Sequence, residues 1–148
     1  ERLVDGGDGG AEEHDAGEVF DSSTGFILAR DPDVMRAPDV AFVSAARLPP
    51  EFVGFLELGP DLAVEVLSPS NTMAEMVRRA ADYFRAGTRL VWLVDGQRRR
   101  VAAWGAGDAP GVPRWLDEGE TLDGGDVLPG FEVPIARFFA GLRRTPRG

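Results

Sequence analysis

The apolar residues of this chain follow two patterns, short runs rich in valine and alanine and one helical repeat. Residues 39–43, 62–67 and 90–94 form such runs, which are typical of buried strands. Between the last two runs, apolar residues recur at every third or fourth position, and this spacing predicts a helix over about 72–86. A strand, a helix and a strand in this order predict a βαβ unit. The apolar face of the helix contains Met73, Met76, Val77, Ala80, Tyr83 and Phe84.

Both ends of the predicted helix carry boundary signals. Ser68, Ser70 and Asn71 come just before it and offer a hydroxyl or amide cap, and Glu75 stands in the first turn. Gly87 follows the repeat and is well placed to end the helix, because glycine accepts the left-handed backbone conformation found there. We therefore interpret the two serines as capping residues rather than as nucleophiles.

Shorter elements are expected in the rest of the chain. Residues 99–104 should pair with 90–94 as a hairpin, because Asp95-Gly96 between them is a turn signal. Residues 47–59 contain two adjacent prolines and are interpreted as an irregular connection. We predict an α/β fold, with a mixed sheet flanked by helices and with β-hairpins, in a single domain over 1–148. The remaining predicted elements are strands at 18–20 and 25–28, short strands near 115, 121–122 and 127–128, a terminal helix over 135–142 and a frayed tail at 143–148.

Two of the predicted strands carry a carboxylate where an apolar residue would be expected. Asp39 opens the first apolar run, and Glu65 lies inside the second. An ionised carboxylate in a sheet costs several kcal/mol unless it is paired or binds a cation. A divalent cation between neighbouring strands, with both acids as ligands, would meet that need. Two plainer interpretations stay open: Asp39 caps a turn or pairs with Arg36, and Glu65 pairs with Arg79.

Composition and charge narrow the classes of function. The chain has 148 residues, no cysteine, no lysine and a net charge of −9. The missing cysteines exclude disulfides and thiolate zinc sites, and the missing lysines exclude Schiff-base chemistry. The negative charge counts against extended non-specific binding to nucleic acid. The missing cysteines also fit a cytoplasmic protein. No apolar run is long enough to span a bilayer, so we expect no membrane segment. No glycine-rich phosphate loop follows the first strand, so we expect no nucleotide cofactor.

Several motifs in a fixed order resemble the Uma-two family of proposed bacterial endonucleases. The resemblance spans roughly 18–139 and implies a restriction-endonuclease-like fold of the PD-(D/E)XK type. The motifs are R-A-P-D-V-A-F-V at 36–43, P-D-L-A-V-E-V-L-S-P-S at 60–70, the helix end Y-F-R-A-G, the strand L-V-W-L-V-D, the late L-P-G-F-E-V-P at 128–134 and the pair Phe138-Phe139.

The resemblance also implies a site and a reaction. It makes Asp39 and Glu65 the ligands of Mg²⁺ or Mn²⁺ in an enzyme that hydrolyses DNA phosphodiester bonds. The lysine usual two residues after the second acid is Leu67 here, and the family's basic residue stands on the following helix, at Arg79, with Arg78 beside it. Arg79 would stabilise negative charge on the phosphate, because arginine stays protonated and cannot act as a base.

A basic cluster in the predicted hairpin adds candidates for DNA contact. Arg98, Arg99 and Arg100 follow one another there. Such a cluster is usually a solvated turn, but Arg98 and Arg99, together with Arg78, are also the best candidates for contacts to phosphate.

A second function stays open, in which the nuclease fold is catalytically degenerate and serves as a binding or oligomerisation module. The acidic charge and the missing lysine favour it. So does the segment 1–17, which we interpret as flexible because residues 6–17 are rich in glycine and acids, or as truncated because the resemblance implies a helix before the strand at 18. Phe52 and Phe55 on the proline-rich connection would suit a homodimer interface.

Overall fold

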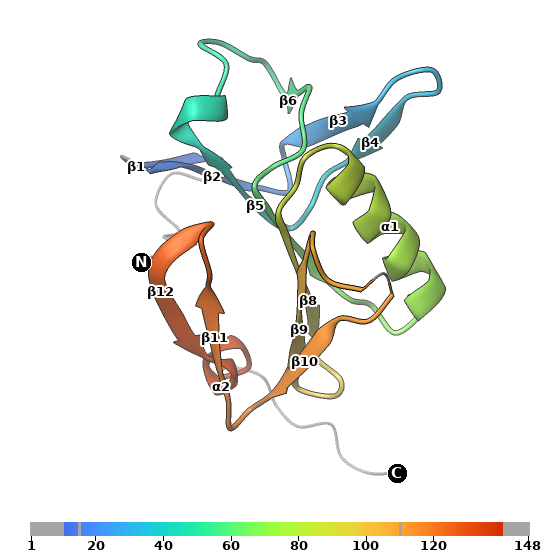
Figure 1. Ribbon diagram of the computed structural model, residues 1–148, viewed down its shortest axis with the longest axis vertical. Coiled ribbons are helices and arrows are strands. Elements are labelled where there is room, and N and C mark those ends of the chain that lie inside the picture. The colour runs from blue at the N-terminus through green and yellow to red at the C-terminus, as the bar shows by residue number, and fades with distance from the viewer. Residues whose placement is uncertain (1–10, 15, 110, 141–148) are drawn as a thin grey trace.

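The fold is built around a large mixed sheet, seen in the computed structural model, which describes residues 11–14, 16–109 and 111–140 (Figure 1). The strands of this sheet are β1 (Ala11–His14), β2 (Gly17–Asp21), β5 (Val40–Ser44), β7 (Leu62–Val66), β8 (Leu90–Asp95), β9 (Arg100–Gly105) and β10 (Arg114–Asp117). They lie in the order β1-β2-β5-β7-β8-β9-β10. Neighbours are antiparallel except β7 and β8, which are parallel.

The parallel pair arises from a βαβ unit, as the sequence predicts. The helix α1 (Met73–Arg85) connects β7 to β8, and Leu62 of β7 pairs with Leu90 of β8. The unit is local in sequence, so the alternation of apolar runs with a helical repeat is sufficient to predict it. The hairpin of β8 and β9 is also confirmed, with Asp95 opposite Arg100.

The start of α1 differs in one residue from the prediction. Thr72 is the N-cap: its hydroxyl accepts a hydrogen bond from the Glu75 N–H at 3.1 Å, and the Glu75 carboxylate accepts one from the Thr72 N–H at 2.9 Å. Asn71 instead accepts a hydrogen bond from the Ser68 N–H at 2.8 Å, which closes a separate turn before the helix. The prediction of a cap at Ser68 to Asn71 was therefore wrong. The helix ends at Arg85, and Gly87 follows its C-cap residue Ala86 with φ of +100°, in the terminating position expected for it.

Smaller elements cover both faces of the large sheet. α1 and a three-stranded sheet in the order β4-β3-β6 lie on one face, and a two-stranded sheet of β11 and β12 lies with α2 on the other (Figure 1). The prediction of an α/β fold with a mixed sheet, flanking helices and hairpins is confirmed. The bounds are β3 (Gly25–Ala29), β4 (Val34–Arg36), β6 (Phe55–Leu56), β11 (Thr121–Gly124), β12 (Leu128–Pro134), α2 (Ile135–Phe138) and the short 3₁₀ helix η1 (Ala45–Arg47).

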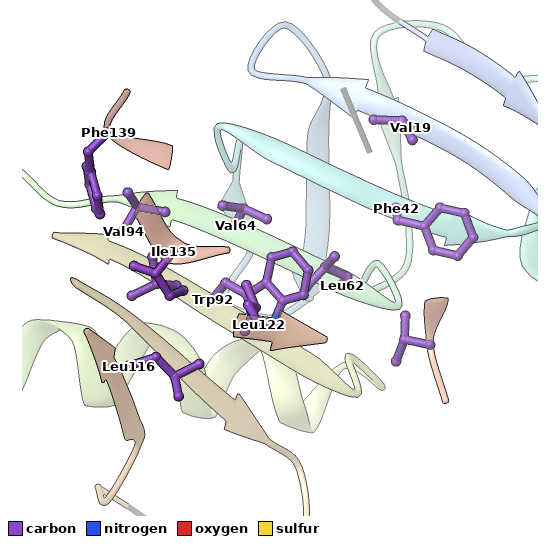
Figure 2. Close-up of a cluster of buried hydrophobic side chains, with 12 residues drawn as sticks. Val19, Phe42, Leu62, Val64, Trp92, Val94, Leu116, Leu122, Ile135 and Phe139 are labelled. Carbon is purple, nitrogen blue, oxygen red and sulfur yellow. The ribbon is translucent and has the colours of Figure 1, made fainter. Parts of the chain in front are cut away.

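The central strands are apolar on both faces because both faces are covered. In β7, Val64 points into the cluster beneath β11, β12 and α2, whereas Ala63 points towards α1. β8 alternates in the same way, with Trp92 and Leu93 on opposite faces. Figure 2 shows Trp92 among the aliphatic side chains of the first cluster, where its ring also stacks on Phe131 at a centroid distance of 5.8 Å.

Three predictions about irregular or terminal segments were wrong in part. Residues 11–14, expected to be a flexible loop, form β1, because even a polar edge strand gains backbone hydrogen bonds from its neighbour β2. The connection 47–59 contains β6, which pairs with β3. The terminal helix stops at Phe138 rather than at 142. Residues 1–10 and the predicted tail at 143–148 lie outside the described residues.

The structure also bears on membrane insertion. In the part of the chain that the structure describes, no helix combines the length and the apolar character needed to cross a bilayer.

Candidate active site

Asp39 and Glu65 face each other at one end of the ladder between β5 and β7. In this antiparallel pair Val40 stands opposite Val64. Asp39 precedes Val40 by one residue and Glu65 follows Val64 by one, so continuing the register places the two acids opposite each other. Facing residues of antiparallel strands point to the same side of the sheet, with Cβ atoms about 4.5–5.5 Å apart. The register therefore places both acids on the same side of the sheet, and the metal site itself stays a prediction.

The side of the sheet is set by the alternation of side chains along β7. Ala63 packs in the cluster formed with α1, and Glu65, two residues further on, points to that same side. Glu65 is only 8% exposed, whereas Asp39 is exposed. The site therefore consists of one carboxylate under the helix and one at the surface beside it.

The helix α1 contacts both oxygens of the Glu65 carboxylate. The hydroxyl of Tyr83 donates a hydrogen bond to Oε2 at 2.8 Å. Nη1 of Arg79 lies 3.6 Å from Oε1, which is an ion pair without a short hydrogen bond. Arg79 and Tyr83 are four residues apart and so are neighbours on one side of the helix. The plainer interpretation of Glu65 as the partner of Arg79 is therefore part of the geometry of the site.

The environment of Glu65 makes its charge costly. Burial raises the pKa of Glu65 above the ordinary value of a glutamate, although the hydrogen bond from Tyr83 and the charge of Arg79 lower it. The nearby carboxylate of Asp39 raises this pKa again, which is a second sign that the two acids are close. Burial, followed by the charge of Glu65, also raises the pKa of the Tyr83 hydroxyl. Tyr83 therefore stays protonated and acts as a hydrogen-bond donor.

Asp39 is held by the backbone of the neighbouring strand. Its Oδ2 accepts a hydrogen bond from the Val66 N–H at 2.8 Å, so the carboxylate caps the end of the ladder. Arg36, the alternative partner considered for Asp39, instead pairs with Asp82 on α1, with Nη2 3.2 Å from Oδ2. Oδ1 of Asp39 is not engaged by the Val66 N–H and remains a candidate ligand atom.

The donor set fits a hard divalent cation. Mg²⁺ is usually bound by one or two carboxylates and keeps several of its water ligands. Asp39 and Glu65 supply two carboxylates on one side of the sheet, each with one oxygen that no hydrogen bond within the described residues occupies. Within those residues no group of three or more histidines, aspartates and glutamates gathers around a point, so these two are the donors available from side chains. A cation would also offset the cost of the buried charge on Glu65.

Of the hairpin arginines proposed for phosphate contact, Arg99 lies on the other face of the sheet from this pair. The side chain of Arg99 is 17% exposed, pairs with Glu118 at 3.1 Å and lies over the ring of Phe139. Phe139 belongs to the cluster on the opposite face of the sheet from Glu65. The structure therefore does not bring Arg99 to the carboxylates.

The other two candidates for phosphate contact are at the surface. Arg98 is exposed and pairs with Asp95, with Nη1 3.5 Å from Oδ2, in the turn after β8. Arg78 is exposed on α1 next to Arg79 and has no ion-pair partner among the described residues. Of the four predicted arginines, Arg79 is thus in contact with Glu65, and Arg78 is its neighbour on the same helix.

Sequence reasoning assigned Tyr83 only to the apolar face of α1 and missed its contact with Glu65. A signal was present: a buried phenol needs a hydrogen-bond acceptor, and Glu65 is a carboxylate in the middle of an apolar strand. Arg36 was missed as a second cation of the site, where its charge lowers the pKa of Glu65. Its place depends on the pairing of β4 with β3, which no local pattern predicts.

Comparisons with known proteins agree with this fold. Residues 8–136 match the model of the Uma2 family, described as "Putative restriction endonuclease". The chain is also similar in structure to a protein from Anabaena variabilis ATCC 29413 described as a "putative nuclease", with a TM-score of 0.71, 17% sequence identity, and coverage of 85% of this chain and 69% of that one. At that identity the likeness shows the fold, and the predicted restriction-endonuclease-like architecture is confirmed. No curated protein matches the chain.

Proposed function

The chain belongs to the Uma2 family, and on that premise we propose that it is a nuclease that hydrolyses DNA phosphodiester bonds with Mg²⁺ or Mn²⁺ held by Asp39 and Glu65. Family membership and the nuclease-like fold support the class of enzyme. The observation that supports the metal site is the register of β5 and β7, which places the two acids opposite each other on the side of α1.

Each residue of the site would have a distinct role in catalysis. A bound dication supplies Lewis-acid chemistry, because it polarises a phosphate oxygen and makes water more acidic. Asp39 and Glu65 hold it and neutralise its charge. Arg79 donates hydrogen bonds to the phosphate and stabilises its growing negative charge, in place of the lysine of the general pattern. The lysine position itself is Leu67, which packs against the cluster under α1.

Charge distribution limits how the protein would hold DNA. The net charge of −9 opposes a polyanion, so long-range attraction cannot supply the affinity. Arg78 and Arg79 give α1 two adjacent positive side chains beside the carboxylates. We propose a small contact that depends on the dication, in which α1 meets one or two phosphates. Binding should fall only shallowly with salt, because few phosphates are neutralised.

The test combines metal binding with cleavage. Mn²⁺ is titrated by calorimetry into the wild type and into the Asp39→Asn/Glu65→Gln double variant. Both substitutions keep the size of the side chain that they replace. Binding by the wild type alone is expected, together with Mn²⁺-dependent nicking of supercoiled plasmid that the double variant lacks. If the wild type takes up no Mn²⁺, the metal-dependent nuclease proposal is wrong.

A second candidate function, the homodimeric binding module, rests on an apolar surface beside β6. Val53 is 87% exposed and Phe55 is 45% exposed, next to a hollow of about 570 Å³. We propose a second copy of the chain as the partner for this surface, because such exposed apolar groups favour protein contact. Sedimentation velocity of the wild type and of Phe55→Glu tests it. A wild type that stays monomeric at all concentrations contradicts this candidate. The hollow is lined by Arg47, Pro49, Glu51, Phe52, Val53, Phe55, Leu56, Glu57 and Leu58.

A further inference from the structure

We propose that Tyr83 is a positioning residue of the metal site, whose hydroxyl fixes the Glu65 carboxylate so that Oε1 is the oxygen left for the cation. This inference rests on the proposed function. It adds to that function a residue that does not touch the metal or the substrate but orients a ligand that does.

The first argument is rigidity. Tyr83 is fully buried, and its ring packs in the cluster between α1 and the sheet, together with Ala80 and Met76, which lie one and two turns earlier in the helix. A ring held in this way keeps its hydroxyl in one place. The carboxylate of Glu65 ends a flexible side chain, and the 2.8 Å hydrogen bond from Tyr83 restricts its rotation. The orientation of the ligand therefore follows from the packing of α1 on β7.

The second argument is the different charge of the two groups that contact Glu65. Arg79 is a cation 3.6 Å from Oε1, so a dication at that oxygen would repel it and free its guanidinium to turn towards a phosphate. Tyr83 is neutral and donates to Oε2, so its contact is compatible with a dication on the other oxygen. Tyr83 is thus the contact that persists in the loaded site. Outer-shell hydrogen bonds of this kind typically contribute about 10- to 100-fold to metal affinity.

A purely structural role for the hydrogen bond makes a different prediction. A buried tyrosine needs an acceptor whether or not the site binds metal, and Glu65 would serve as that acceptor. Under this interpretation Tyr83→Phe changes the stability of the fold and leaves the affinity for metal unchanged. Under ours it changes the affinity for metal at temperatures where the variant is fully folded.

The chain offers a matched control for this substitution. The hydroxyl of Thr88 is also buried, and it has no hydrogen-bond partner among the described residues. Thr88→Val therefore removes a buried hydroxyl close to the end of α1 without touching Glu65. It is expected to bind Mn²⁺ as the wild type does.

The experiment is a calorimetric titration of Mn²⁺ into the wild type, Tyr83→Phe and Thr88→Val, each checked for folding by its thermal transition. We expect affinity to fall about 10-fold or more in Tyr83→Phe. An affinity within twofold of the wild type overturns the role of Tyr83 and leaves the proposed function standing. A wild type that binds no Mn²⁺ overturns both, so the two failures are distinguishable.

A spectroscopic measurement on the unaltered chain keeps the inference testable if Tyr83→Phe does not fold. The chain has a single tyrosine, so tyrosine labelled with ¹³C at ring carbon ζ gives one resonance from Tyr83. Saturating Mg²⁺ should shift this resonance, because a dication on Glu65 weakens the hydrogen bond that the carboxylate accepts. The shift should disappear in Glu65→Gln. A resonance that Mg²⁺ leaves in place while calorimetry shows binding contradicts the inference.

Discussion

The N–H of Val66 donates a hydrogen bond to Oδ2 of Asp39 at 2.8 Å, so the strand that carries Glu65 also holds the other acid of the site. Asp39 lies outside β5, and without this bond its side chain would be free at the exposed end of the ladder. One backbone donor thus ties the position of the first carboxylate to the position of the second.

This bond can be separated from metal binding by two substitutions at Asp39. Asp39→Asn keeps an oxygen acceptor for the Val66 N–H, so its free energy of unfolding should stay close to that of the wild type. Asp39→Ala removes the acceptor and should lower the free energy of unfolding by about 1 kcal/mol. Both variants should lose Mn²⁺ affinity. Urea denaturation and calorimetry check the two effects, and equal stability of Asn and Ala variants would contradict the role of the bond.

The buried charge on Glu65 predicts a pH dependence of stability in the absence of metal. Its pKa is raised above the ordinary value of 4.5, mainly by burial, so the folded state binds this proton more tightly than the unfolded state does. This contribution to stability is fully present below about pH 4.5 and is lost as the pH rises through the raised pKa. Relative to Glu65→Gln, the metal-free wild type should therefore become less stable from pH 4 to pH 8.

Urea denaturation of the wild type and Glu65→Gln across this range, with a chelator present, measures that difference. Saturating Mn²⁺ at pH 8 should then raise the stability of the wild type and leave the Gln variant unchanged, because ligand binding to the folded state stabilises it. A stability difference that is constant from pH 4 to pH 8 would count against a raised pKa.

The neighbouring arginines of α1 should behave differently when each is removed. Arg79→Ala takes away the cation nearest to Glu65 and should reduce plasmid nicking about 100- to 1000-fold, the usual effect of losing one donor to a developing negative charge. Its Mn²⁺ affinity should not fall, since Arg79 competes with the metal for Glu65. Arg78→Ala removes only a proposed phosphate contact and leaves the cation next to Glu65 in place, so it should reduce nicking much less than Arg79→Ala does. Equal activity of the two variants in a timed nicking assay would remove Arg79 from the mechanism.

Asp61 is expected to matter for stability and not for metal binding. It is 2% exposed, accepts a hydrogen bond from the Ser44 N–H at 2.8 Å and pairs with Arg47 at 2.9 Å and Arg89 at 3.4 Å. Asp61→Ala leaves these donors without their acceptor and should lower the free energy of unfolding by about 2–3 kcal/mol. Urea denaturation measures this loss. At a temperature where the variant is folded, its Mn²⁺ affinity should match that of the wild type.

Local patterns in the sequence were sufficient for the βαβ unit and for the two acids. The helical spacing from Met73 to Phe84 between two apolar runs predicts β7, α1 and β8, because each signal lies within one element. Asp39 and Glu65 stand out for the same reason: a carboxylate among valines and alanines is costly wherever the strand is placed. The strand β1 has no such apolar pattern, and it forms only because β2 offers backbone partners.

What the sequence by itself determined, then, is the order of the main elements and the identity of the two carboxylates. Only the tertiary structure decided that these acids face each other, that Tyr83 binds Glu65, and that Arg99 turns to Glu118 on the far side of the sheet. Each of these facts depends on the register of paired strands or on the rotation of a helix about its axis. Register and rotation are set by the packing of the whole domain, and a shift of one residue would move a side chain to the other face.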